Sequence, residues 1–222
     1  IVDRCGREPQ RLISILQAVQ DAYQHLPEPA LDRVLYETDI VTVGRFRAPV
    51  SHPRFQDSGP TRNHVFVFPR TSVVIRHEGR PPVTVDCCTV TFYNRGQRYT
   101  REPVDPRGDR CEWFAVRSDV LRDVVADFDP GVKDRSAPFD RTHGRSDSRS
   151  YAAQRSLTRH LSGAGEPDPL AVEEAVMAVL QRVLTLTMES TGSGDAGPGG
   201  GGPASEQLVG DVRAYLLRRF RE

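Results

Sequence analysis

Four side chains are of the types that could hold a catalytic metal: His52, His64, His77 and Glu78. Imidazole and carboxylate ligands suit first-row divalent metals, and such a site needs two or three histidines that converge with a carboxylate. The sequence has no His-x-His pair, and His77-Glu78 falls in a predicted turn beside Gly79. We therefore interpret these histidines as surface or core-edge side chains and expect no metal or other cofactor.

The cysteines Cys5, Cys87, Cys88 and Cys111 offer a second kind of chemistry. They form no CxxC pair and no cluster at zinc spacing, and adjacent Cys87 and Cys88 are expected to point to opposite faces of a strand. Arg110 beside Cys111 would favour a thiolate, but no partner histidine is suggested by the local spacing. We expect free thiols in or near a core, in a reducing cytoplasm, and no enzymatic activity.

A small-molecule pocket would be lined by inward-facing strand residues with apolar bodies and a few polar groups. The candidates are His64, Phe66, Arg76, Tyr93 and Trp113. Tyr93 and Arg76 are the stronger candidates, because burying their polar groups requires partners. Ordinary barrel packing is the alternative for each candidate, and it is favoured for Phe66 and Trp113.

These candidates lie in a zone rich in β-branched and aromatic residues, from about residue 36 to residue 116. Turn-forming residues divide this zone into predicted strands at 40–43, 64–68, 72–75, 83–85, 88–93 and 112–116. Strands at this spacing, with no helices between them, indicate an antiparallel sandwich or small barrel. Several strands are apolar on both faces, so another layer must cover the outside.

Helices are predicted on both sides of the β zone. Downstream, apolar residues recur at helical spacing within 118–126, 151–161 and 170–188, and Ser118 is the expected N-cap of the first helix. Upstream, apolar residues at three- and four-residue steps predict a helical hairpin, whose second helix starts at Pro29.

The helix predicted at 170–188 is the expected interaction feature. Its apolar positions spread wider than a single seam, so one face can pack on the barrel while another meets a partner helix in a homodimer. The residues expected at that interface are Val176, Val179, Leu180 and Val183. The alternative is a helix buried wholly within its own domain.

After these helices the chain continues with a linker and a final helix. Gly-rich residues 190–205 predict a flexible tether, and residues 206–220 predict a helix.

The chain has 30 acidic and 30 basic residues, so it lacks the positive field of a self-sufficient DNA binder. Lys133 is the only lysine, as in a GC-rich bacterial genome. With no apolar membrane span or signal-peptide core, we expect a cytoplasmic protein without membrane contact.

The β zone and the helices after it resemble the N-terminal effector domain of AraC-type transcriptional regulators. The matching segments are 35–39 (LYETD), 43–47 (VGRFR), 52–55 (HPRF), 57–60 (DSGP), 66–73 (FVFPRTSV), 91–97 (TFYNRGQ) and 107–114 (RGDRCEWF). Residues 208–216 (LVGDVRAYL) resemble the first helix of that family's double helix-turn-helix domain.

This resemblance implies a cupin-like barrel for a small effector, helices that dimerise, and DNA reading by a following pair of helix-turn-helix units. The sequence departs from the family pattern because the recognition helices are absent. The final helix, with Arg213, Arg218 and Arg219, can touch a phosphate but cannot read base edges. DNA binding is therefore expected only through a C-terminal domain absent from this chain.

Residues 11–27 (RLISILQAVQDAYQHLP) resemble the helical start of the thioredoxin-like iron–sulfur subunit of NADH dehydrogenase. In that family the helical start precedes a four-cysteine cluster domain. No cysteines with matching spacing follow here, so redox activity is not transferred.

The predicted fold is α+β, a cupin-like antiparallel β-barrel or sandwich followed by helices, with a short N-terminal helical hairpin. The expected divisions are a helical extension at 1–35, the effector-binding and dimerisation domain at 36–189, the linker at 190–205 and a truncated helix-turn-helix domain at 206–222. The predicted function is effector sensing and dimerisation in an AraC-type regulator. The alternatives are a metal-dependent cupin enzyme and a fragment of the iron–sulfur subunit.

Overall fold

The computed structural model describes residues 31–53, 55–57 and 59–192. Two antiparallel sheets are present in this part of the chain, one of six strands in the order β1-β2-β8-β3-β6-β9 and one of three in the order β5-β4-β7. The strands are β1 (Leu31–Glu37), β2 (Val41–Ala48), β3 (Val65–Pro69), β4 (Val73–His77), β5 (Val83–Val85), β6 (Thr89–Tyr93), β7 (Tyr99–Pro103), β8 (Asp109–Val116) and β9 (His143–Arg145).

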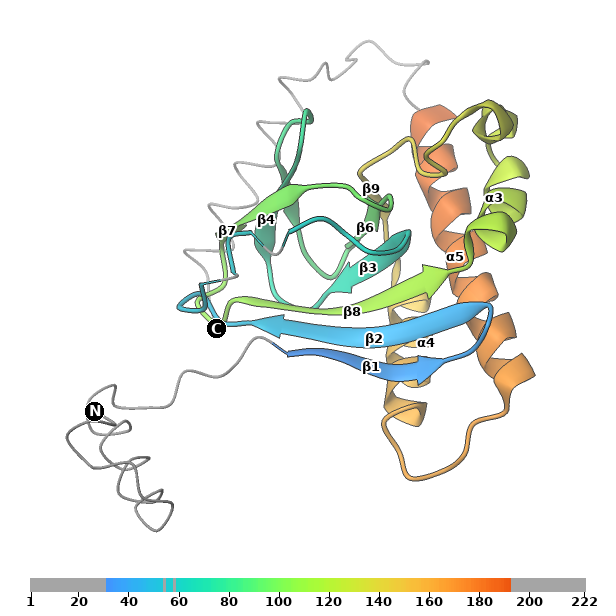
Figure 1. Ribbon diagram of the computed structural model, residues 1–222, viewed down its shortest axis with the longest axis horizontal. Coiled ribbons are helices and arrows are strands. Elements are labelled where there is room, and N and C mark those ends of the chain that lie inside the picture. Colours follow the sequence, from blue (N-terminus) through green and yellow to red (C-terminus); the bar gives the residue numbers. More distant parts are fainter. Residues whose placement is uncertain (1–30, 54, 58, 193–222) are drawn as a thin grey trace, which may run out of the picture.

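The helices gather on one side of the six-stranded sheet (Figure 1). They are α3 (Ser118–Ala126), α4 (Ser148–His160) and α5 (Pro169–Gly192), with the short 3-10 helix η2 (Pro130–Asp134) after α3. One apolar cluster joins these helices to the outer face of the large sheet, and a second lies between the two sheets. The molecule is therefore a sandwich of two sheets with a helical layer on one side, as the sequence predicts.

Strand β8 lies at the centre of the large sheet, between β2 and β3. Side chains alternate along a strand, so its residues divide between the two apolar clusters. Phe114 packs toward the helices, where its ring stacks on Phe66 with the ring centroids 5.2 Å apart. Cys111 and Trp113 belong to the cluster between the sheets. A strand buried on both faces explains why the residues at 113–116 are apolar without alternation.

Helix α5 supplies most of the apolar surface of the helical layer. Val176, Val179, Leu180 and Val183 are each no more than 4% exposed and belong to the cluster shared with the large sheet. Their spacing of three and four residues puts them on one face of the helix. These four side chains therefore pack within their own domain and are not placed to meet a partner helix. A helix buried within its own domain is the alternative that the sequence left open.

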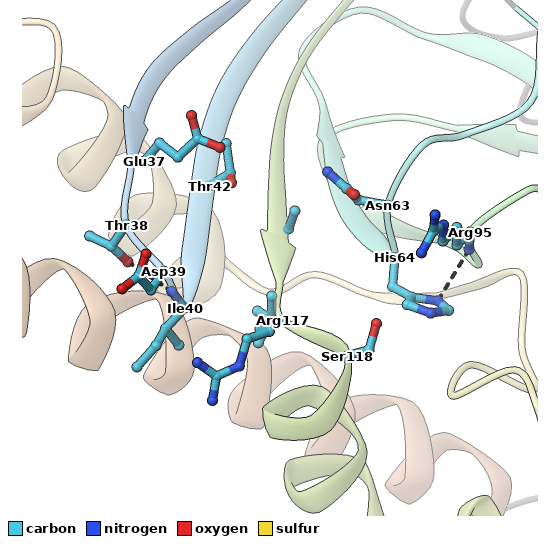
Figure 2. A pocket seen from close by; sticks show the side chains of 12 residues that line it. Glu37, Thr38, Asp39, Ile40, Thr42, Asn63, His64, Arg95, Arg117 and Ser118 are labelled. Atoms are coloured by element: carbon cyan, nitrogen blue, oxygen red, sulfur yellow. Dashed lines mark hydrogen bonds between the residues drawn. The ribbon is translucent and has the colours of Figure 1, made fainter.

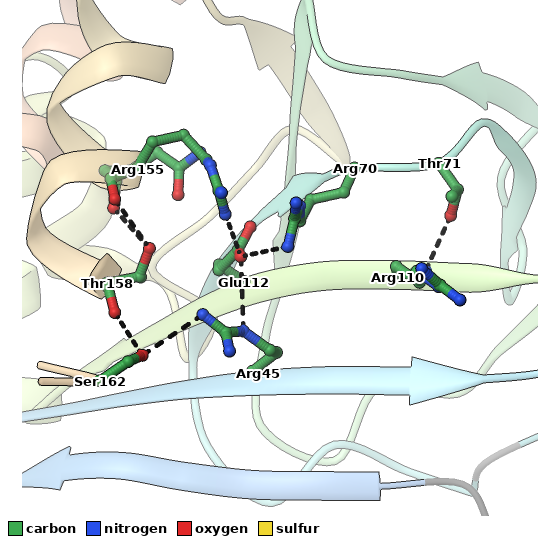
Figure 3. Close-up of polar contacts among 9 residues, drawn as sticks. Arg45, Arg70, Thr71, Arg110, Glu112, Arg155, Thr158 and Ser162 are labelled. Carbon is green, nitrogen blue, oxygen red and sulfur yellow. Dashed lines mark hydrogen bonds and ion pairs between the residues drawn. The ribbon is translucent and has the colours of Figure 1, made fainter. Parts of the chain in front are cut away.

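A buried carboxylate connects the large sheet to α4 (Figure 3). Glu112 of β8 is fully buried and faces the helical layer. Its Oε1 lies 2.7 Å from Arg155 Nη1 of α4, 3.6 Å from Arg45 Nε of β2 and 3.5 Å from Arg70 Nη1 after β3. Burial raises the pKa of Glu112, and the positive charges of the arginines oppose that shift. The carboxylate of Glu112 thus fixes β2, β8 and α4 relative to one another.

The secondary structure differs from the sequence predictions in several places. Residues 31–35, expected in a helix, belong to β1, which pairs antiparallel with β2. β1 completes the edge of the large sheet, so hydrogen bonding to β2 outweighs local helix propensity. Ser118 is the first helical residue of α3, whose N-cap is Arg117 without a side-chain cap bond. Strands β7 and β9 were not predicted, and the first helix of the hairpin lies outside the described residues.

No helix in the described part of the chain is long and apolar enough to cross a membrane. Helix α5 has the length, but its exposed positions include Glu174, Gln181 and Glu189. Its apolar residues are taken up by the core instead.

His77 lies at the end of β4, fully buried among aromatic rings. Its ring centroid is 4.7 Å from that of Tyr93 and 6.3 Å from that of Tyr99. Burial lowers the pKa of His77 to about 4, and the charge of His143 adds to that shift. His77 is therefore a neutral packing residue at neutral pH.

We expect Glu112→Ala to lower the free energy of unfolding by about 3–5 kcal/mol, because the arginines that face this carboxylate lose their counter-charge. Guanidinium unfolding would measure this loss. Glu102→Ala is the matched control, because the Arg76–Glu102 pair is 51% and 56% exposed. Such a surface pair contributes about 1 kcal/mol or less. Equal losses in the two variants would contradict the assigned role of Glu112.

The folded protein is expected to lose stability through His77 as the pH falls. Since the pKa of His77 is about 4 when folded and about 6.5 when unfolded, folding favours its neutral form. The contribution of the neutral His77 ring to the free energy of unfolding is complete above about pH 6.5. It decreases toward pH 4, with a total change of about 3 kcal/mol.

Urea unfolding of wild type and His77→Phe at pH 7 and pH 4.5 would measure this effect, because other acid-titrating groups cancel in the difference. The variant should lose less stability than wild type on acidification. His160→Gln, at an exposed position, serves as the control and should follow wild type. An unchanged pH dependence in His77→Phe would refute the assignment.

Candidate ligand-binding cavity

A cavity of about 540 Å³ lies between the two sheets and opens to the surface. Its lining combines the apolar side chains of Phe46, Val65, Val67, Val73, Ile75, Val85 and Cys111 with Asp32, Tyr93, Tyr99, Arg101, Asp109 and Trp113. These residues come from strands of both sheets, so the cavity is the lumen of the sandwich. A pocket of this size, lined by both apolar side chains and hydrogen-bonding groups, could hold a small molecule.

A buried polar cluster forms one wall of the lumen. Arg101 of β7 is only 4% exposed, and its Nε lies 2.7 Å from Asp109 Oδ2. Its Nη2 donates to the Tyr99 hydroxyl at 2.6 Å, and its Nη1 donates to the Phe55 carbonyl at 2.9 Å. Burial raises the pKa of Asp109, and the Arg101 guanidinium opposes that shift. The pair is thus held in place by several elements.

Aromatic rings surround the guanidinium of Arg101. Its Cζ lies 4.6 Å from the ring centroid of Phe46 and 4.8 Å from that of Tyr99. A desolvated guanidinium over an aromatic face is stabilised by the ring quadrupole. Burial raises the pKa of Tyr93 well above its usual value, so its hydroxyl stays protonated. The lumen therefore offers a fixed cation, a carboxylate and phenolic hydroxyls in an apolar surrounding.

Trp113 lies opposite Gly44 of β2 in the strand register. A Cβ at Gly44 would lie 2.2 Å from two atoms of the Trp113 ring, so a larger residue there would displace the indole. Trp113 Nε1 donates to Asp32 Oδ1 of β1 at 2.8 Å. Trp113 is the only tryptophan in the sequence, so its fluorescence reports on the wall of the cavity.

A smaller hollow of about 270 Å³ lies beside the lumen (Figure 2). It is formed by the β1–β2 turn, the start of α3 and the segment before β3, and it shares Glu37, Thr42 and Asn63 with the lumen. His64 lines this hollow, and its Nδ1 accepts a hydrogen bond from the Arg95 backbone N–H at 3.1 Å. Burial is the main cause that lowers the pKa of His64. Charged and polar groups dominate here, so the lumen is the better small-molecule site.

The five predicted ligand-binding residues divide between different surroundings. Tyr93 and Trp113 line the lumen. His64 lines the neighbouring hollow. Phe66 packs in the cluster under the helices, and Arg76 is exposed on the outer face of β4, where it pairs with Glu102. For Phe66 and Arg76 the expected inward direction is wrong, because the neighbouring residues Val65, Val67 and Ile75 take the inward positions.

Sequence reasoning missed Tyr99, Arg101 and Asp109. The strand β7 that carries Tyr99 and Arg101 is polar in sequence, with only Tyr99 and Pro103 as apolar members. The two-residue periodicity of β8 was the signal that could have found Asp109, because Asp109, Cys111 and Trp113 share one face of this strand. The burial of Arg101 depends on the Asp109 partner, which lies in a different strand.

The structure does not assemble the metal site or the reactive cysteine that the sequence analysis considered. Among the described residues, the single group of histidine, cysteine or carboxylate side chains with metal-ligand spacing contains no histidine. Cys111 is a buried free thiol, as the sequence predicts, and burial raises the pKa of this thiol well above its usual value. Arg110 lies on the other face of β8 and cannot activate Cys111. The lumen thus holds no arrangement suited to nucleophilic catalysis by this cysteine.

Comparisons with known proteins give matches at the level of structure. No family model and no curated protein matches the chain. A variant of ToxT from Vibrio cholerae strain SCE256, solved in its apo form, has a TM-score of 0.51 at 7% identity, covering 83% of this chain and 68% of that chain. At this identity the likeness shows the fold alone. The resemblance of residues 11–27 to an NADH dehydrogenase subunit is not supported.

Two further similar structures have lower scores. Another structure of ToxT from Vibrio cholerae has a TM-score of 0.45 at 7% identity, covering 82% of this chain and 68% of that chain. A cupin domain from Bordetella pertussis Tohama I has a TM-score of 0.33 at 14% identity, covering 42% of this chain and 98% of that chain. The chain has an α+β fold, in which an antiparallel sandwich is followed by helices.

Proposed function

We propose that this chain is the small-molecule sensing part of an AraC-type transcriptional regulator. The observation that carries the proposal is the lumen of about 540 Å³ with the Arg101–Asp109 pair in its wall. A ligand with an apolar body and one polar group would match the apolar walls and the fixed hydrogen-bonding groups. The proposal includes no chemical reaction.

The likeness to ToxT, an AraC-family regulator, supports this assignment at the level of fold. The segments that resemble the family fall largely on elements that build the lumen, among them β2, β3, β6 and β8. The proposal places the protein in the cytoplasm and assigns DNA reading to a separate domain, because regulators of this kind divide sensing from reading.

Strand β8 offers a physical route from the lumen to the helices. Trp113 contacts the lumen, and Glu112 beside it carries the ion pair with Arg155 of α4. Adjacent residues of one strand point to opposite faces, so a ligand that shifts Trp113 also moves the backbone that positions Glu112. Ligand binding would therefore bias the packing of α4 against the sheet.

Homodimerisation is part of the proposal, through a surface other than the one expected from the sequence. The four apolar residues of α5 once expected at the interface are buried in the core. The outer face of α5 carries Ala171, Glu174, Ala178 and Gln181, which are exposed. A dimer through this helix would be formed by small and polar side chains.

We expect the aromatic sulfonate 8-anilinonaphthalene-1-sulfonate to bind in the lumen of the native protein, because it combines an apolar body with one anionic group. Binding should quench Trp113 emission and sensitise the emission of the probe. Val67→Phe fills the lumen from β3 and should weaken binding at least about tenfold, equivalent to about 1.4 kcal/mol.

Val74→Phe is the matched control, because Val74 points away from the lumen on β4 and the same volume is added outside. It should bind the probe like wild type. A cooperative thermal transition in each variant would exclude probe binding to a loosely packed state. Equal weakening in both variants, or no change in Trp113 emission on binding, would overturn the proposed site.

A further inference from the structure

The turn between β5 and β6 carries two neighbouring thiols. Cys87 and Cys88 are both exposed, and their Sγ atoms lie 4.0 Å apart. The sequence predicted that they point to opposite faces of a strand, but both residues lie in the turn before β6 begins at Thr89. The strict alternation of a strand does not apply in a turn, so the two sulfur atoms share one side.

Hydrogen bonds fix the backbone of this turn. Asp86 Oδ1 accepts from the Cys88 N–H at 2.8 Å and from the Thr89 hydroxyl at 3.3 Å. The Thr89 N–H donates to the Asp86 carbonyl at 3.0 Å, and the Ser146 N–H donates to the Cys88 carbonyl at 2.9 Å. The thiols are therefore presented by an ordered turn.

The distance between the sulfur atoms matches a shared metal ion. Two thiolates at about 2.3 Å from a tetrahedral zinc ion are about 3.8 Å apart. A disulfide requires about 2.05 Å between the sulfur atoms and a Cα separation of at least about 4.4 Å, whereas adjacent Cα atoms are about 3.8 Å apart. The pair at 4.0 Å thus fits metal ligation better than disulfide formation.

A carboxylate completes a set of three ligands. One ligand atom from each of Asp86, Cys87 and Cys88 lies within 4.8 Å of the other two. Within the part of the chain that the structure describes, this is the single group with such spacing. Thiolates select soft metals, and a carboxylate oxygen is an accepted third ligand for zinc.

We propose that Asp86, Cys87 and Cys88 bind one thiophilic divalent metal ion of the zinc and cadmium class. Each thiol loses its proton as its sulfur binds the metal, so one ion releases two protons at this pair. The fourth position is open to water. The site revises the expectation, drawn from the sequence, that the chain holds no metal.

The position of the turn connects this site to both layers of the sandwich. Val85 at the end of β5 lines the lumen. Cys88 is hydrogen-bonded to Ser146, which follows β9, and a Cβ at Gly144 of β9 would lie only 2.0 Å from Thr187 Oγ1 of α5. A metal that stiffens the turn would therefore act on the lumen and on the packing of α5, and this regulatory consequence rests on the proposed sensing function.

Cadmium is the probe, because thiolate ligation produces an ultraviolet charge-transfer band. The protein carries Cys5→Ser throughout, which removes the cysteine outside the described residues. We expect one cadmium ion per chain by calorimetry, with the thiolate band appearing in parallel. Cys87→Ser and Cys88→Ser should each weaken binding at least about tenfold and reduce the band. Asp86→Asn keeps an oxygen for the turn and should weaken binding while the band remains.

Cys111→Ser is the control, since Cys111 is buried on the lumen side of β8 and should not contribute. Magnesium should not compete, because a hard cation avoids thiolates. Absence of the band, an unchanged affinity in either turn variant, or half an ion per chain would overturn the site. Val67→Phe should retain full cadmium binding, so a failure of the lumen proposal and a failure of the metal proposal are distinguishable.

Discussion

Burial of β8 on both faces is the constraint on which the rest of the structure depends. Its outer face must match the helices, and its inner face must match the lumen. Phe114 meets the first requirement by packing under the helical layer, and Trp113 meets the second by lying over Gly44. A shift of one residue in register would exchange these two sets of side chains, so packing on either face enforces the same register.

Charged pairs on the two faces of β8 strengthen this constraint. Glu112 faces Arg155 of α4 on the outside, and Asp109 faces Arg101 inside the lumen. Desolvation makes a buried charge costly unless it is paired, so a register that separated these partners would be strongly disfavoured. The pairs therefore specify one arrangement of sheet and helices more than they add to its stability, and the inner pair leaves charged groups in the wall of the cavity.

The parts of the fold with strong local patterns were predicted well. Strands β3 and β6 follow short apolar runs bounded by turn residues, and α3 begins and ends where its apolar periodicity does. Strand β7 was missed because its sequence is polar, and its place in the small sheet depends on pairing with β4. Strand β1 was missed because its residues suit a helix locally, whereas the unpaired edge of β2 offered a ladder of hydrogen bonds.

The sequence by itself determined the class of the fold: an antiparallel sandwich covered by helices. Periodicity and turn residues act locally, so they are readable along one chain. Only the tertiary structure decided which side of each strand faces the lumen. It also decided that Arg101 is buried against Asp109, and that Cys87 and Cys88 lie together on one turn. Those outcomes depend on partners from distant strands and on backbone geometry between strands, which a linear pattern does not contain.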